Sequence, residues 1–167
     1  SMYKINENGS MTEAQPQSSR KWKESRRQAL LDAAKSLLWE RGFEAMSPRA
    51  VQEASQTGQG SFYHHFSGKQ ALAAAAIEEI RDELVGDFDA AFRLDQPPLE
   101  RIEEYLGRLR DGLKGCRIGR LTAERSIAEE TIRAPVAAFF EHVAEALADS
   151  LAEAQSLGHL PRHLNPG

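Results

Sequence analysis

Apolar side chains recur at intervals of three and four positions through most of the chain, a spacing that predicts amphipathic helices. The first such stripe follows Arg20 and ends at Arg41–Gly42, where the glycine is expected to take the left-handed conformation that closes a helix. Ser47–Pro48 predicts the start of a second, short helix, because serine caps free backbone N–H groups and proline at the first helical position loses no hydrogen bond. A third short helix is expected over residues 61–66.

Further stripes predict a helical body after these three helices. A fourth helix is expected over about 69–92, stopped by Pro97–Pro98, and a fifth from about residue 102 until Gly115. Another is expected over about 118–130, and a long helix from Pro135 until Gly158. Strand-like alternation is absent from the sequence, so the predicted class is all-α, with a three-helix N-terminal head and an antiparallel helical C-terminal body.

The first 19 residues are polar and show no periodicity, which predicts a disordered tail over 1–19. The predicted organisation is therefore a tail over 1–19, a head over 20–67 and a body over 68–167.

Charge is distributed unevenly along the chain, although the net charge is only −4. Residues 20–69 contain nine basic and five acidic side chains, whereas residues 77–167 contain 11 basic and 18 acidic ones. A polyanion is therefore expected to bind the N-terminal part and to be repelled by the rest.

Several classes of protein are excluded or disfavoured by the residue content. The single cysteine, Cys116, cannot form an internal disulfide or a multi-cysteine zinc site. Pro161 stands between His159 and His163 and prevents the helical spacing that would bring both rings to one metal. The longest apolar run, residues 71–77, is far shorter than the ~20 residues of a membrane span. We expect no metal, no cofactor, no catalytic residue and no membrane contact, and a cytoplasmic protein.

Two short helices joined by a tight turn, behind a longer helix and within the basic segment, are the parts of a helix-turn-helix. The stretch Gly60–Phe66 reads Gly-Ser-Phe-Tyr-His-His-Phe and is followed by Lys69 and Leu72. This segment resembles the TetR family of bacterial transcriptional regulators over about residues 29–80, most specifically in the element Tyr-x-His-Phe-x-x-Lys that begins at Tyr63. The resemblance implies an all-helical homodimer with a DNA-binding head over 20–67 and a body that binds a small ligand and the partner subunit.

The resemblance also implies roles for individual residues of the head. Ser47 and Lys69 lie at predicted helix starts, where free N–H groups and the helix dipole favour a phosphate. The other candidates face the major groove or reach phosphates and base edges. The full set of candidate DNA-binding residues is Ser47, Arg49, Gln59, Ser61, Tyr63, His64 and Lys69.

Several of these residues also have a purely structural explanation that does not involve DNA. Tyr63 can be a core aromatic, Lys69 a solvated helix end, and Arg49 and Gln59 ordinary surface side chains. The basic cluster within residues 20–27 is either a solvated helix end or a contact to phosphates that flank the site.

The predicted turn departs from the family pattern at two positions, because Gln56 replaces a common glycine and Gly58 a common serine. Either Gln56 adopts a positive φ, at a cost on the order of 1 kcal/mol, or Gly58 moves the left-handed residue along the turn.

In the body, the resemblance points to residues on the helices that line family ligand pockets. They are Tyr105, Arg108, Cys116, Glu124, Phe139, Phe140 and His142, each of which can equally be core or surface. Gly115–Cys116 resembles the entry to the sixth helix in one subset of the family. Cys116 is either an oxidant sensor or an inert small hydrophobe.

Members of the family continue after a segment such as 160–167 with two more helices that form the dimer, so this chain is expected to lack the final dimerisation helices. The function expected is that of a repressor that binds a palindromic DNA operator as a homodimer and is released by a small-molecule effector. Two alternatives are open: a helical small-molecule-binding protein without DNA recognition, and a thiol-based redox sensor acting through Cys116.

Overall fold

The computed structural model describes residues 3–5, 11–13, 16–111, 116–161 and 163. Its head contains α1 (Pro16–Ala45), α2 (Pro48–Ser55) and α3 (Gln59–His65). Its body contains α4 (Lys69–Ala91), α5 (Pro98–Asp111), the 3-10 helices η1 (Gly119–Ala123) and η2 (Arg125–Ala128), and α6 (Glu130–Ser156). The all-α prediction is confirmed for head and body.

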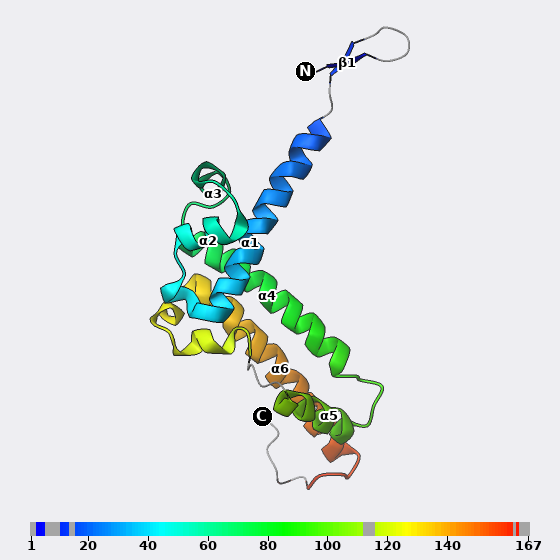
Figure 1. The fold of residues 1–167 in the computed structure, drawn as a ribbon. Helices are drawn as coiled ribbons and strands as arrows, with labels where there is room; N and C mark the ends of the chain where they lie inside the picture. Colours follow the sequence, from blue (N-terminus) through cyan, green and yellow to red (C-terminus); the bar gives the residue numbers. More distant parts are fainter. Residues whose placement is uncertain (1–2, 6–10, 14–15, 112–115, 162, 164–167) are drawn as a thin grey trace.

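Helices α4 and α6 pack side by side and lead away from the head, and α5 lies across their far ends (Figure 1). The core lies where α4 and α6 meet the C-terminal half of α1. The stripe predicted for α1 is buried there, and it consists of Leu30, Ala33, Ala34, Leu37 and Leu38. None of the described helices is long and apolar enough to cross a membrane.

The N-terminal segment contains more regular structure than the predicted tail. Strands β1 (Tyr3–Ile5) and β2 (Met11–Glu13) pair antiparallel, with Tyr3 opposite Glu13, and α1 begins at Pro16. The sequence between the two strands contains Asn8–Gly9, a dipeptide typical of hairpin turns. The polar composition of the segment, on which the predicted tail rests, conceals this local signal.

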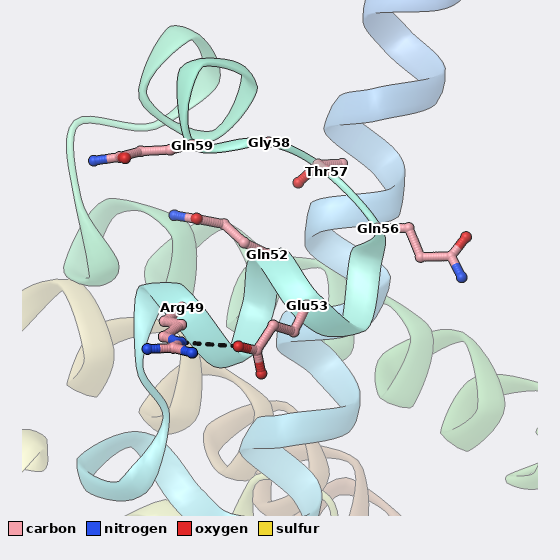
Figure 2. A pocket seen from close by; sticks show the side chains of 7 residues that line it. All are labelled: Arg49, Gln52, Glu53, Gln56, Thr57, Gly58 and Gln59. Atoms are coloured by element: carbon pink, nitrogen blue, oxygen red, sulfur yellow. Dashed lines mark hydrogen bonds and ion pairs between the residues drawn. The ribbon is translucent and has the colours of Figure 1, made fainter.

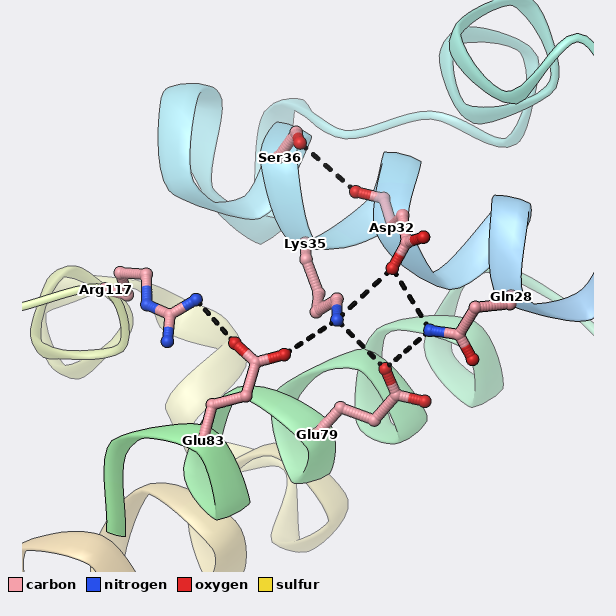
Figure 3. A network of polar contacts seen from close by, with 7 residues as sticks. All are labelled: Gln28, Asp32, Lys35, Ser36, Glu79, Glu83 and Arg117. Atoms are coloured by element: carbon pink, nitrogen blue, oxygen red, sulfur yellow. Dashed lines mark hydrogen bonds and ion pairs between the residues drawn. The ribbon is translucent and has the colours of Figure 1, made fainter. Parts of the chain in front are cut away.

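Lys35 of α1 forms ion pairs with two glutamates of α4 and so joins the head to the body (Figure 3). The Lys35 ammonium lies 2.9 Å from a Glu83 carboxylate oxygen, 3.1 Å from Glu79 and 3.3 Å from Asp32, and Glu83 also pairs with Arg117 at 2.7 Å. Burial alone would lower the pKa of Lys35, but the hydrogen bonds to the three carboxylates raise it above its ordinary value. The same pairing lowers the pKa of Glu83. Because four of these five residues come from α1 and α4, the network fixes how the two helices lie against each other.

The prediction of a helix over 118–130 is wrong, because two 3-10 helices occupy that segment. They are separated by Glu124, whose backbone is extended at φ −92° and ψ 154°. Its carboxylate accepts a hydrogen bond from the backbone N–H of Glu44 at 3.0 Å, and the N–H of Arg125 donates to the Glu44 carboxylate at 3.1 Å. These reciprocal bonds tie the segment to the end of α1, which a continuous α-helix would not allow.

Other helix ends also differ from the expected positions. Helix α6 begins at Glu130, so Pro135 lies inside the helix rather than at its start. It ends before Gly158, whose φ of +78° confirms the predicted glycine closure. Helix α5 begins at Pro98, and its expected end at Gly115 lies outside the described residues.

Candidate nucleic-acid interface

The turn between α2 and α3 resolves the two geometries left open by the sequence. Ser47 caps α2 as predicted, because its Oγ accepts a hydrogen bond from the Ala50 N–H at 3.1 Å. Gln56 takes the left-handed conformation at φ 54° and ψ 33°, whereas Gly58 has φ −77°. The glycine at 58 therefore does not relieve Gln56, which bears the strain of the turn.

Replacing Gln56 with glycine is expected to raise the free energy of unfolding by about 0.5–1 kcal/mol, since relief of the left-handed strain exceeds the added entropy of the unfolded chain. Chemical denaturation of the purified variant measures the change. The matched control is Gln52→Gly inside α2, where the same substitution should cost about 1 kcal/mol. An unchanged or lower stability for Gln56→Gly would contradict the assigned strain.

An open hollow lies between α2 and the start of α3, and long polar side chains line it (Figure 2). The side chains of Arg49, Gln52 and Gln59 end on the same side, whereas Gln56 points away from them (Figure 2). We call these three residues the groove face. Gln52 is not among the candidates predicted from the sequence, although its place three residues after Arg49 on α2 puts both on one side of the helix.

The members of the groove face differ in how freely they can meet a base. The Nε of Arg49 pairs with Glu53 at 2.8 Å while its side chain is 87% exposed, so a base contact has to compete with an exposed ion pair. Gln59 is exposed at the first position of α3. Glutamine and arginine are the side chains that read adenine and guanine edges in the major groove.

Helix α3 presents the predicted ring residues to solvent. Tyr63 is 53% exposed and lies edge-on to the fully buried Phe62, with 5.0 Å between ring centroids. His64 is exposed on the same helix. Ser61, predicted to face the groove, instead has a buried hydroxyl oxygen without a hydrogen-bond partner among the described residues. Tyr63 and His64 are therefore better placed for DNA than Ser61.

The end of α3 packs against α1. Phe66 is buried, and the Arg27 guanidinium lies 5.4 Å from its ring centroid. Burial is the largest cause that lowers the pKa of His65, followed by the positive charges of His64, Arg27, Lys23 and Arg26. His65 is therefore neutral at physiological pH.

Lys69 stands at the start of α4 as predicted, but its ammonium already has partners within the head. It donates a hydrogen bond to the Glu44 carbonyl at 3.2 Å and lies 4.3 Å from the Phe43 ring centroid. Lys69 therefore joins the end of α1 to the start of α4, and its contact with a phosphate stays a prediction.

A second hollow, the distal cleft, lies at the far end of the body and has a volume of about 660 Å³. The rings of Phe88 and Phe92 stack there at a centroid distance of 5.0 Å, and His142 Nε2 lies 2.7 Å from Asp89 Oδ1. The full lining is Phe88, Asp89, Phe92, Leu94, Arg101, His142, Ala146, Asp149, Ser150 and Glu153.

A buried arginine supports the wall of the distal cleft. Arg101 donates from Nε to the Ser150 hydroxyl at 2.9 Å, pairs with Glu153 and lies over the Phe92 ring. Its remaining nitrogen donates to the Leu94 carbonyl at 3.3 Å. Because these partners occupy the guanidinium, Arg101 stabilises the wall rather than offering a free charge to a ligand.

The seven effector residues expected from the sequence do not converge on one site. His142 lines the distal cleft, and Tyr105 packs edge-on against Phe88 behind it at 4.8 Å. Arg108 pairs with Glu104 on the surface, and Glu124 lies at the junction with the head. The rest are separate: Cys116 is exposed, Phe139 is buried and Phe140 is 43% exposed. The sequence does not single out Phe88, Phe92 and Arg101, because they look like ordinary positions of an amphipathic helix.

A helix-turn-helix head with a polar groove face, joined to a helical body, defines a DNA-binding transcriptional regulator. Residues 30–76 match the family model described as bacterial regulatory proteins, tetR family. The chain belongs to the TetR family.

Known proteins resemble the chain well beyond the head. The HTH-type transcriptional repressor DhaR of Mycobacterium sp. (strain GP1) is 26% identical over 143 residues, which is 84% of this chain and 72% of DhaR. The transcriptional regulator AcuR of Cereibacter sphaeroides is 28% identical over 147 residues, 83% of this chain and 67% of AcuR. A crystal structure of a regulatory protein TetR from Rhodobacter sphaeroides superposes with a TM-score of 0.68 at 29% identity, covering 83% of this chain and 77% of that chain.

Proposed function

We propose that the protein is a repressor that binds a palindromic operator as a homodimer and leaves it when a small molecule occupies the body. The groove face carries this proposal, because Arg49, Gln52 and Gln59 point to one side of the helix-turn-helix with lengths and donors suited to base edges. The similarity to DhaR, a protein named as a repressor, supports repression over activation. Tyr63, His64 and the capped start of α2 at Ser47 supply the expected phosphate contacts.

The distal cleft is the proposed effector site. Its volume lies within the range of about 300–1,000 Å³ typical of small-molecule sites, and it combines aromatic walls with carboxylates. Those features suit an amphipathic molecule.

The distal cleft and the DNA-binding head are joined by one helix. Helix α4 begins at Lys69, directly behind α3, and ends beside the cleft at Ala91. An effector that binds more tightly to a shifted position of α4 would move the heads away from the spacing that the operator requires.

Selection from a pool of randomised duplex DNA tests the DNA-binding part of the proposal. We expect the wild-type chain to enrich a palindrome with an affinity that falls steeply with salt. Tyr63→Ala should weaken binding by tenfold or more, equivalent to about 1.4 kcal/mol, without loss of helical structure. Tyr63→Phe removes the hydroxyl but keeps the ring, and so distinguishes their contributions to DNA affinity. Tyr105→Phe in the body is the matched control.

Unchanged affinity in Tyr63→Ala would count against the proposed interface. Enrichment of no sequence at any salt concentration would favour the alternative of a small-molecule-binding protein without DNA recognition. The exposure of Cys116 supports the redox alternative. A Cys116→Ser protein that still releases DNA fully in response to oxidants would reject it.

A further inference from the structure

The N-terminal part of α1 extends beyond the packed head (Figure 1). Residues 20–28 are all exposed, and the burial of α1 begins only around Leu30. An isolated helical segment of this length is marginal in water, because it gains nothing from packing. A projecting helix without an apolar face is better explained by a polar partner than by the core.

This projection is strongly basic. We call its residues 20–27 the basic arm, which holds one acidic side chain, Glu24, and the basic residues Arg20, Lys21, Lys23, Arg26 and Arg27. The neutralisation by Glu24 is weak, because its carboxylate lies 3.9 Å from Arg20 and both side chains are more than 70% exposed. The arm therefore offers several free positive charges to solvent.

The inner end of the arm lies beside the end of α3. Arg27 covers the ring of Phe66, the residue that ends α3. Lys23 lies four residues before Arg27 and Arg20 seven residues before it, so the three share a helical side. The positive charges of Arg27, Lys23 and Arg26 also act on His65 at the end of α3 and lower its pKa. By contrast, Lys21 lies seven residues before Gln28, whose amide donates to Glu79 of α4 at 3.1 Å, so Lys21 belongs to a different side.

We propose that the basic arm binds phosphates of the DNA backbone beyond the segment read by the helix-turn-helix, through Arg20, Lys23 and Arg27. This inference rests on the proposed operator binding. The arm spans roughly 10 Å at 1.5 Å per residue. One DNA strand presents a phosphate about every 3.4 Å along the duplex axis, so two or three phosphates lie within reach of each arm. The acidic remainder of the chain repels DNA. The basic side of the arm is therefore the surface on which the flanking DNA docks.

Two measurements on the full chain test the arm. Affinity is measured over a range of salt concentrations for the selected operator alone and for the operator lengthened by random flanks. The wild type should bind the longer duplex about tenfold more tightly at low salt, and the Arg20→Gln, Lys23→Gln, Arg27→Gln triple variant should lose this gain. For this variant, log affinity should decrease less steeply with log salt concentration than for the wild type, by about 2 to 3 units of slope per subunit. Lys21→Gln is the matched control and should lose less than one unit of slope.

Equal slopes for wild type and triple variant would overturn the inference. A Lys21→Gln effect as large as that of one arm residue would also overturn it, since it would show a general field rather than one binding side.

The two proposals fail in different ways. If selection enriches no operator, the proposed function fails, and the arm is then measured on random duplex, where equal salt slopes for wild type and triple variant reject it too. If an operator is enriched while the arm variants bind it like the wild type on both duplexes, the operator proposal stands and the arm inference falls.

Discussion

Gly42→Ala is expected to lower the free energy of unfolding by about 3 kcal/mol or more, which is a large part of the stability of a domain of this size. Gly42 has φ +81° and ψ 175°, a backbone region that residues with a Cβ rarely adopt. A Cβ on Gly42 would also lie 2.0 Å from Oε1 of Glu124, a carboxylate that bonds the Glu44 N–H. The substitution therefore adds backbone strain and displaces a hydrogen bond at the same point.

The damage would extend to the contact between head and body. Arg120 donates to the carbonyls of Glu40 and Arg41 at 3.1 and 3.4 Å, and so holds the turn of α1 just before Gly42 to η1. A displaced Glu124 would disturb this same junction. Loss of stability should therefore be accompanied by weaker cooperation between the head and the body during unfolding.

Chemical denaturation followed by circular dichroism measures the effect of Gly42→Ala. Gly86→Ala is the matched control, because Gly86 lies within α4 with no atom within 4 Å of an added Cβ, and it should gain up to about 1 kcal/mol. Adding Glu124→Ala to Gly42→Ala removes the collision but keeps the backbone strain. A Gly42→Ala protein as stable as the wild type would refute this account of the junction.

The features that the sequence predicted well are those determined by neighbours along the chain. The Ser47 cap and the buried stripe of α1 follow from local backbone chemistry and helical spacing. The first helix does not end at Gly42 as predicted: Gly42 has a positive φ, but its ψ of 175° is not left-handed helical, and it kinks α1, which continues to Ala45. The helix predicted over 118–130 is wrong because Glu124 bonds a residue 80 positions away, and this partner is invisible to a local pattern. The same holds for the distal cleft, whose wall depends on Arg101 meeting Ser150 across 49 positions.

In the candidate interface too, local sequence determines some features and contacts between distant residues determine the others. Motif spacing located the helix-turn-helix and placed Tyr63 and Gln59 on its exposed side. It did not show that the Ser61 hydroxyl is buried or that Lys69 bonds the Glu44 carbonyl, since both depend on tertiary packing. The motif therefore predicts a surface, and tertiary packing decides which of its side chains are free.

Gln59→Ala is expected to produce the largest loss of operator affinity among the groove-face variants. Gln59 is exposed at the first position of α3, and the N-terminal residues of a recognition helix contact base edges in the major groove. Arg49, by contrast, is already paired with Glu53. A bidentate base contact contributes about 1–3 kcal/mol of discrimination. In a homodimer the loss occurs in both half-sites and doubles to about 2–6 kcal/mol, which predicts a reduction between about 30-fold and about 25,000-fold.

Selection from randomised DNA with the Gln59→Ala protein distinguishes base recognition from a general weakening. A lost base contact should relax sequence preference at one symmetric pair of positions and leave the salt slope nearly unchanged, because no phosphate contact is removed. Gln56→Gly is the matched control, since its side chain points away from the groove face and its removal should keep both motif and affinity (Figure 2). An unchanged motif for Gln59→Ala would assign recognition to Arg49 and Gln52, because the groove face would then read DNA through α2 rather than through α3.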